Sequence, residues 1–238
     1  HPEITAENPD APANFGHLDQ QFGTRWVKRN IAAFGGDPDR ITVAGQSGGA
    51  AGTGALHASP LMKGLINRVS IESGPIYWGF MQPQDRSVLE QKGVAFMEYI
   101  GCKSIAELRK KDAWELFDAY SKYTEGQGLA GGFSFCVDGE FIPKPYSEIM
   151  DSGEFNDFDV LMGSCSQEFP CVDPEKFTVE EFHAYLAEAF PDNVENMKKW
   201  YPAENGVQAA KQASTIASDI MLLGSAKIGE ICKKFGRK

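Results

Sequence analysis

The stretch Ile41-Thr42-Val43-Ala44-Gly45-Gln46-Ser47-Gly48-Gly49 decides how this chain folds. Its first four residues form a short, mostly apolar run typical of a strand, and Gly48 opens a segment of small residues suited to starting a helix. Between them Ser47 stands in a Gly-x-Ser-x-Gly pattern, the setting of a nucleophile elbow, in which a tight turn exposes a serine hydroxyl. Gly45 and Gly49 supply the small residues that we expect such a turn to need. Ser47 is therefore the candidate nucleophile.

The segments on either side of the elbow predict an alternation of helices and strands. Upstream, apolar residues recur at helical spacing and stop at Gly35-Gly36-Asp37-Pro38, where glycine favours a helix end and proline prevents continuation. These residues are Leu18, Phe22, Trp26, Val27, Ile31, Ala33 and Phe34. Downstream, residues 48–57 predict a small-sided helix, and Arg68-Val69-Ser70-Ile71-Glu72 predicts a second strand. The order indicates an α/β fold whose β–α–β crossover is right-handed.

Beyond residue 75 the pattern changes to helices and loops. Helical spacing predicts helices over 87–100, 106–109, 113–120 and 210–235. Residues 133–139 read as an extended run into a turn, and residues 158–162 as a buried strand. We expect one incomplete domain made of an elbow region (1–75), a helical and loop insert (76–155), a strand with an acid loop (156–172) and a helical region (173–238).

Composition narrows the classes of partner. The 23 Lys and Arg against 33 Asp and Glu give a net charge of −10, spread along the chain, which argues against a nucleic acid partner. No apolar run approaches the roughly 20 residues that cross a bilayer. We expect no membrane span, and the sequence leaves a secreted and a cytoplasmic location equally open.

The five cysteines contain no closely spaced pairs typical of a metal site, so we expect no metal and no other cofactor. An odd number cannot all pair within one chain. Cys165 and Cys171 are close enough in sequence to suggest a disulfide, but the favoured interpretation is two ordinary thiols in a reducing compartment. The remaining cysteines are Cys102, Cys136 and Cys232.

Longer stretches carry a resemblance to a known family. Residues 14–20, Asn-Phe-Gly-His-Leu-Asp-Gln, fit the pattern Asn-x-Gly-x-x-Asp-Gln, and Trp26-Val27 with residues 30–38 leads into the elbow. These segments resemble the type-B carboxylesterases, an α/β-hydrolase family that also holds the cholinesterases and the non-catalytic neuroligins. Further matches follow in the family's order at Ser59-Pro60, Glu72-Ser73-Gly74, Val137-Asp138-Gly139, Ile142-Pro143 and residues 163–168. The resemblance implies a partial α/β-hydrolase fold, a mostly parallel sheet with flanking helices.

The same resemblance shows what these 238 residues lack. The family carries a His-Gly-Gly-Gly loop before the elbow and a catalytic histidine after the acidic residue, and neither motif is found here. The chain is therefore expected to be the central portion of a longer protein, without its amino- and carboxyl-terminal parts. Other segments of that protein would complete the site, and the fragment alone is expected to be inactive.

Three residues make up the predicted catalytic machinery. Ser47 would attack the substrate, and the backbone amide of Gly48, the residue after the nucleophile, would donate to the oxyanion at a helix start. Glu168, which follows a strand and matches the family's acidic residue, would orient the base. Its neighbours Asp157, Asp159 and Asp173 are rivals for this role, and a solvated loop glutamate is the alternative explanation of Glu168.

No histidine of the chain is expected to be the base. His57 lies ten residues past Ser47, which is about 15 Å of rise along a helix and too far for a hydrogen bond. His183 falls on what we predict to be an exposed helix face, and His1 and His17 lie near the amino end. The base is expected outside this chain.

Segments after the second predicted strand could serve the site. Glu72-Ser73-Gly74 either supports the catalytic residues or packs at the strand end. The aromatic residues Tyr77, Trp78 and Phe80 come where the family often lines its acyl pocket, and they are the predicted substrate-pocket residues.

Two functions from different classes fit these observations. The first is a serine carboxylesterase that hydrolyses small uncharged carboxylic esters through an acyl-enzyme on Ser47. The alternative is a catalytically silent, neuroligin-like adhesion or scaffold protein, because fold does not fix function. This chain has Gly48-Gly49 where the family usually has alanine and glycine, which puts the geometry of the oxyanion donor in question.

Overall fold

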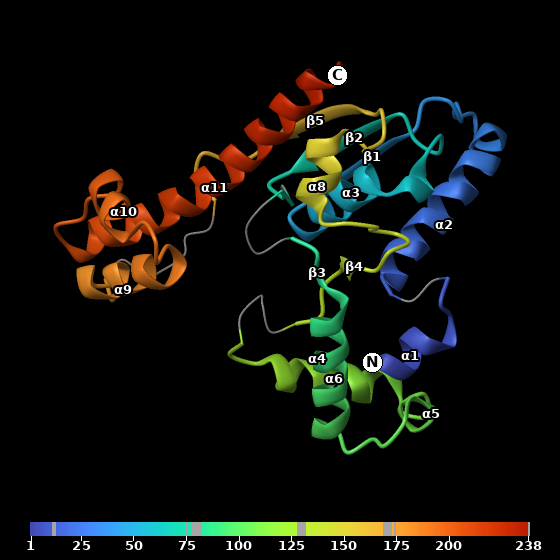
Figure 1. Ribbon diagram of the computed structural model, residues 1–238, viewed down its shortest axis with the longest axis horizontal. Coiled ribbons are helices and arrows are strands. Elements are labelled where there is room, and N and C mark those ends of the chain that lie inside the picture. The colour runs from blue at the N-terminus through green and yellow to red at the C-terminus, as the bar shows by residue number, and fades with distance from the viewer. Residues whose placement is uncertain are drawn as a thin grey trace.

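The computed structural model of the chain describes residues 1–10, 13–74, 76–77, 82–127, 132–168, 173 and 175–237 (Figure 1). Its centre is a parallel sheet of strands β1 (Thr42–Gln46), β2 (Arg68–Glu72) and β5 (Asp159–Gly163), in the order β1-β2-β5. Gly45 lies opposite Ile71, and Ile71 lies opposite Met162. A parallel sheet with helices between its strands confirms the predicted α/β class and the partial α/β-hydrolase fold.

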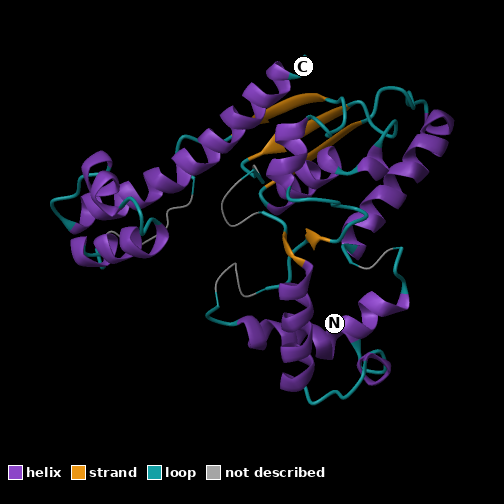
Figure 2. Ribbon diagram, in the orientation of Figure 1, coloured by secondary structure: helices purple, strands orange, loops and turns teal. Residues whose placement is uncertain are grey.

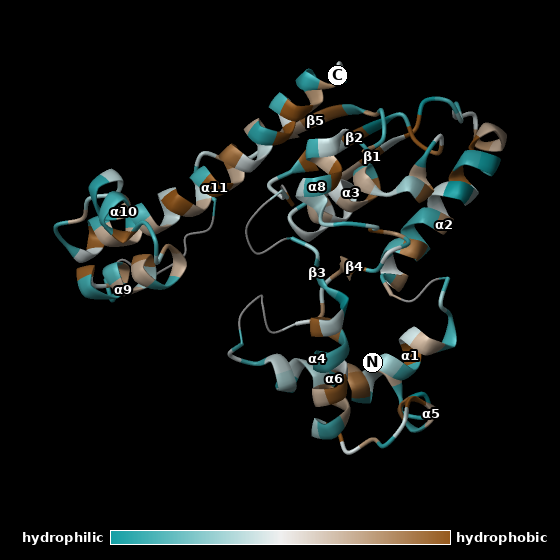
Figure 3. Ribbon diagram, viewed as in Figure 1, coloured by the Kyte–Doolittle hydropathy of each residue, from teal (hydrophilic) through white to brown (hydrophobic). Residues whose placement is uncertain are grey.

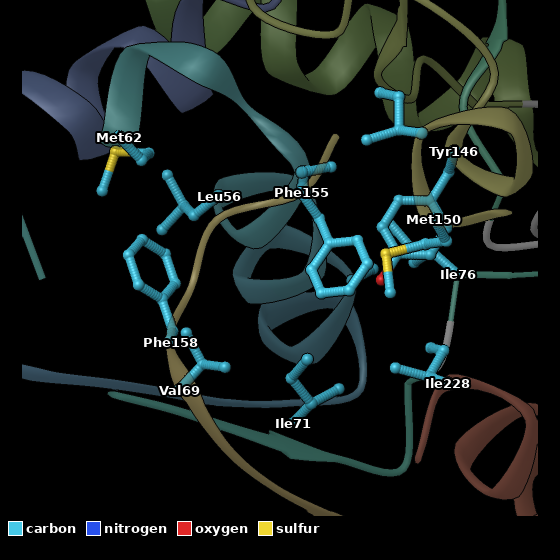
Figure 4. Packing of buried hydrophobic residues seen from close by; sticks show 14 of the residues in the cluster. Leu56, Met62, Val69, Ile71, Ile76, Tyr146, Met150, Phe155, Phe158 and Ile228 are labelled. Carbon is cyan, nitrogen blue, oxygen red and sulfur yellow. The ribbon is translucent and has the colours of Figure 1, made fainter. Parts of the chain in front are cut away.

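One face of this sheet carries the main hydrophobic core. Helix α3 (Gly48–Ala58) packs on it, together with α8 (Tyr146–Ser152) and the second half of α11 (Gly206–Lys234). Side chains from β2, α3, α8 and the loop before β5 point toward one another there, with the Phe155 ring among them (Figure 4). On the opposite face β1 and β5 expose alternate residues, and Leu161 is 72% exposed. The sheet is thus covered on one side by the described elements.

Most of the remaining elements form two further groups (Figures 1 and 2). The first group joins the body through the short parallel strands β3 and β4. It consists of α1 (Pro2–Glu7), β3 (Gln84–Asp85), α4 (Arg86–Tyr99), α5 (Ile105–Leu108), α6 (Ala113–Thr124) and β4 (Cys136–Val137). The second group, which we call the helical arm, consists of α9 (Val179–Ala189), α10 (Val194–Trp200) and the first half of α11. Helix η2 (Pro60–Met62) connects α3 to β2.

Helix α11 links the arm to the sheet. Apolar and polar residues alternate along its length (Figure 3), as the predicted helix over 210–235 requires. Its first half packs with α9 and α10 around a small separate core of Phe182, Leu186, Met197, Ala209, Ala213 and Ile216. No helix within the described ranges combines the length and apolar character of a membrane span. The predicted division into four regions within one domain remains a prediction.

Helix α2 (Phe15–Asn30), continued by η1 (Ile31–Phe34), contains the apolar stripe predicted upstream of the elbow. Most residues of that stripe do not belong to the buried core. Phe22, Trp26 and Phe34 are 64%, 49% and 73% exposed. The helix instead faces the body with Leu18 and the buried Gln21, whose amide donates to the Leu61 carbonyl oxygen at 3.1 Å. Periodicity therefore locates the helix correctly, while its buried face is set by contacts that the sequence does not show.

Two of the family-like motifs are structural. The Asn14 side chain bonds both backbone groups of Cys136, donating to its oxygen at 2.8 Å and accepting from its nitrogen at 2.9 Å. Asp138 is 5% exposed and accepts from the Ile142 amide at 2.9 Å, in a turn where Gly139 takes φ 89°. Since a positive φ favours glycine, the Val137-Asp138-Gly139 segment serves this turn.

Candidate active site

Ser47 has the backbone of a nucleophile elbow. It joins β1 to α3 with φ 55° and ψ −118°, a region that residues other than glycine rarely adopt. The Ser47 amide donates to the Glu72 carbonyl oxygen at 2.9 Å, and the Ser47 carbonyl oxygen accepts from the Ala51 amide at 2.9 Å. These two bonds fix the turn between neighbouring strands. The serine residue is partly exposed, so its hydroxyl is not enclosed in the core.

Close backbone approach explains one glycine of the elbow and not the other. A Cβ on Gly45 would lie 2.1 Å from the Gly49 carbonyl oxygen, so only glycine fits there. A Cβ on Gly74 would lie 2.6 Å from the Ser47 carbonyl oxygen, which places the same restriction after β2. A Cβ on Gly49 would meet nothing within 4 Å. The expectation that both flanking glycines are needed therefore holds sterically for Gly45 alone, because the crowded contact is between Gly45 and the backbone of residue 49.

Gly48 is the first residue of α3, where the backbone amides of the opening turn have no carbonyl partner within the helix. It is exposed, and a Cβ there would also meet nothing within 4 Å. The alanine usual in the family would fit without moving the backbone, so this departure leaves the geometry of the turn intact.

The three strands end side by side. The Ser73 amide donates to the Gly163 carbonyl oxygen at 2.8 Å, as the Ser47 amide does to Glu72, so the residues after β1, β2 and β5 meet at one edge of the sheet. A groove of about 450 Å³ extends from this edge over the exposed face of the sheet, and Ser47 is not among its lining residues. It is lined by Gln46, Ser70, Glu72, Ser73, Leu161, Met162, Gly163, Ser164, Cys165 and Glu168. In parallel α/β sheets this carboxyl-terminal edge is where ligands bind.

Glu168 reaches this groove from the loop after β5. Its Oε1 accepts from the Cys165 amide at 2.7 Å, and its own amide donates to Ser218 Oγ on α11 at 2.8 Å. The residue is partly buried; the first bond holds its carboxylate and the second its backbone. The sequence predicts a role for Glu168 but not for Ser218. Ser218 could have been noticed as a polar residue within the small and apolar stripe of a predicted helix.

The rival carboxylates are engaged elsewhere. Asp159 starts β5, at the end of the strand away from the groove, and pairs with Arg68 at 3.5 Å. Asp157 pairs with Arg237 at 2.8 Å, and Asp173 pairs with Lys176 at 3.1 Å. Of these acidic residues, Glu168 is the one that lines the groove.

The four histidines lie away from the groove lining. His57 is fully buried in α3, with Nε2 3.0 Å from the Asn156 carbonyl oxygen, and burial lowers its pKa to about 4. His17 stacks on Phe141, and burial also lowers its pKa. His183 lies on α9 beside Phe182 and is partly buried, where a more exposed face had been predicted, because α9 packs into the arm. His1 caps α1.

The predicted pocket aromatics are only partly described. The Tyr77 hydroxyl donates to the carboxylate of Asp151 at 2.8 Å, and Lys227 Nζ lies 5.8 Å from its ring centre. Trp78 and Phe80 lie outside the described residues, as does Cys171. Cys165 is a free, exposed thiol.

A serine on a strained strand-to-helix turn, at the carboxyl end of a parallel sheet that also presents a loop glutamate, defines the α/β-hydrolase class. Residues 4–225 match the model of the carboxylesterase family, and the chain belongs to that family.

Curated relatives agree with this membership. The chain is 30% identical to fumonisin B1 esterase of Sphingopyxis macrogoltabida over 230 residues, which is 92% of this chain and 40% of the relative. It is 32% identical to bile salt-activated lipase of Rattus norvegicus over 205 residues, 76% of this chain and 32% of the relative. It is 31% identical to acetylcholinesterase of Leptinotarsa decemlineata over 166 residues, 65% of this chain and 26% of the relative. The chain thus spans two fifths or less of the length of these relatives.

Proposed function

We propose that the full-length protein is a serine carboxylesterase that hydrolyses uncharged carboxylic esters through an acyl-enzyme on Ser47. The observation that carries this proposal is the backbone of Ser47, at φ 55° and ψ −118° between β1 and α3, in a residue that is partly exposed. Family membership and relatives named as esterases and a lipase support ester hydrolysis in general.

In the proposed reaction, Ser47 Oγ attacks the carbonyl carbon of the ester while a histidine base takes its proton. The oxygen that becomes negative accepts from the Gly48 amide at the start of α3, where the helix dipole favours negative charge. The intermediate collapses, and the alcohol leaves with the proton returned by the base. Water then attacks the acyl-enzyme by the same route and releases the acid.

Glu168 would hold the base in the correct orientation and stabilise its imidazolium form. Its Oε1 is held by the Cys165 amide on the groove wall, which favours a fixed carboxylate. Because His1, His17, His57 and His183 are placed elsewhere, the base would come from sequence outside these 238 residues. The 238-residue chain alone would then be inactive.

A covalent probe tests the nucleophile directly. A fluorophosphonate reagent should label the full-length protein, and Ser47→Ala should abolish labelling and lower hydrolysis of a short-chain nitrophenyl ester by at least about 10⁴-fold. Ser121→Ala is the matched control, because Ser121 lies on α6 and its hydroxyl donates only to the Phe117 carbonyl oxygen. Equal labelling of the parent protein and Ser47→Ala would refute Ser47 as the nucleophile, and absence of labelling in both would favour the catalytically silent alternative.

A second substitution pair tests the acid. Glu168→Gln keeps the shape of the side chain and removes its charge, so kcat should fall by about 10³- to 10⁴-fold. Asp173→Asn makes the same chemical change at a carboxylate paired with Lys176, and its kcat should stay close to that of the parent. If the two variants exchanged these results, the assignment of Glu168 would be wrong.

A further inference from the structure

We infer that Ser218 of α11 is a positioning residue for the proposed acid Glu168. This inference rests on the proposed function, since it concerns how the acid of that site is held. Ser218 lies 50 residues after Glu168 in the chain, and its Oγ is 2.8 Å from the Glu168 backbone nitrogen. It does not line the groove, so it acts through Glu168 and not on substrate.

The direction of this hydrogen bond is fixed by the helix. Ser218 Oγ also lies 2.9 Å from the Ser214 carbonyl oxygen, one turn earlier in α11. A hydroxyl has one proton and two lone pairs, and a carbonyl oxygen can only accept. The Ser218 proton therefore goes to Ser214, and the lone pairs of its oxygen accept from the Glu168 amide.

Burial makes the Ser218–Glu168 hydrogen bond hard to replace. Ser218 is 7% exposed, so water cannot readily replace it as the partner of the Glu168 amide. The carboxylate end of the same residue is held by the Cys165 amide. Glu168 is thereby fixed at two points, its backbone by α11 and its side chain by its own loop. Loss of the Ser218 hydroxyl would remove the contact that holds the Glu168 backbone, and the carboxylate could then move with its loop.

The same part of α11 belongs to the helical arm. Asp219, the next residue, accepts a hydrogen bond from the Tyr201 hydroxyl, after α10, at 2.7 Å. Ser218 thus stands where the arm meets the loop that carries the acid. The Ser218 side chain links the packing of the arm to the placement of Glu168.

The test compares Ser218→Ala with Ser225→Ala in the full-length protein. Ser225 is two helical turns along α11 and is also 7% exposed, but its hydroxyl has no hydrogen-bond partner within the described residues. For Ser218→Ala we expect kcat toward a nitrophenyl ester to fall by roughly 5- to 10-fold, with KM changed less than about twofold. Ser225→Ala should leave both constants unchanged.

The pH profile separates positioning from general destabilisation. A fixed carboxylate raises the pKa of the base because it favours the imidazolium ion. With Glu168 loosened, the acidic limb of kcat/KM should move toward lower pH in Ser218→Ala, and Ser218→Thr, which keeps the hydroxyl, should restore the parent profile. If Ser218→Ala does not fold, Ser218→Cys, which changes little volume and keeps only a weak acceptor, takes its place with the same expectation.

Two outcomes would overturn the inference. One is a Ser218→Ala profile that coincides with that of Ser225→Ala. The other is a loss of activity at Ser218 that Thr fails to restore and that leaves the acidic limb in place. Failure of the proposed function looks different, because the parent protein would then have no esterase activity or Ser47→Ala would keep it, whatever happens at Ser218.

Discussion

Around the elbow, backbone segments approach so closely that one methyl group on Gly45 or Gly74 would overlap neighbouring atoms, whereas the helices of the arm pack around a small core of side chains. Among the described residues, the elbow packs on a core of twenty buried residues, and the arm on a core of six. Contacts between main chains tolerate no added volume, while contacts between side chains can repack. The proposed nucleophile Ser47 is therefore held by the less adaptable of the two regions, and the proposed acid Glu168 is tied to the more adaptable one through Ser218.

Gly45→Ala is the change expected to break the elbow. Its Cβ would lie 2.1 Å from the Gly49 carbonyl oxygen, and neither β1 nor α3 can shift without losing core contacts. The cost should exceed the roughly 3 kcal/mol at the upper end of ordinary overpacking. Urea unfolding followed by circular dichroism measures it. A variant as stable as the parent would show that the turn is looser than the structure indicates.

Leu186→Ala tests the arm in the same way. Leu186 is fully buried between α9 and α11, and removing its side chain should cost about 3 kcal/mol. Because the arm has its own core, we expect α9 and α10 to lose protection in hydrogen exchange while β1, β2 and α3 keep theirs. Equal loss of protection in both regions would mean that the two cores unfold as one unit.

Low pH should lower the stability of the core beneath the elbow. Burial lowers the pKa of His57 to about 4 from the ordinary 6.5, so the unfolded state binds a proton more readily between these values. Stability from this group is complete above pH 6.5 and is lost as the pH falls toward 4, by about 2 kcal/mol at pH 5. Unfolding free energies at pH 7 and pH 5 should differ less in His57→Gln, which cannot titrate. An unchanged difference would exclude His57 as the cause.

Gly49→Ala is the matched comparison for Gly45→Ala, and its expected effect on stability is small. Its Cβ would meet nothing within 4 Å, and residue 49 lies inside α3. Alanine restricts the unfolded chain and favours a helix, so stability should rise by about 0.5 kcal/mol. Thermal unfolding of the two variants side by side gives opposite shifts if the asymmetry of the elbow is real. A destabilised Gly49→Ala would restore the simpler view that both glycines are needed.

Much of the elbow region could be predicted because its strands and helices follow local patterns. The predicted strand 68–72 coincides with β2, and residues 48–57 fall within α3 (Gly48–Ala58). The exposure of Phe22, Trp26 and Phe34 was not predicted, because periodicity locates an apolar stripe without showing what packs on it. Ser218 could not be paired with Glu168 either, since a hydrogen bond across 50 residues leaves no local trace in the sequence.

The dihedral angles of Ser47 lower the stability of the turn that the proposed activity requires. A left-handed backbone of this kind costs a residue with a side chain about 1 kcal/mol or more, and glycine adopts it freely. Ser47→Gly is therefore expected to be more stable than the parent protein and to lack the hydroxyl at residue 47. The stability of the turn and the proposed catalytic role of the hydroxyl therefore place opposite demands on residue 47.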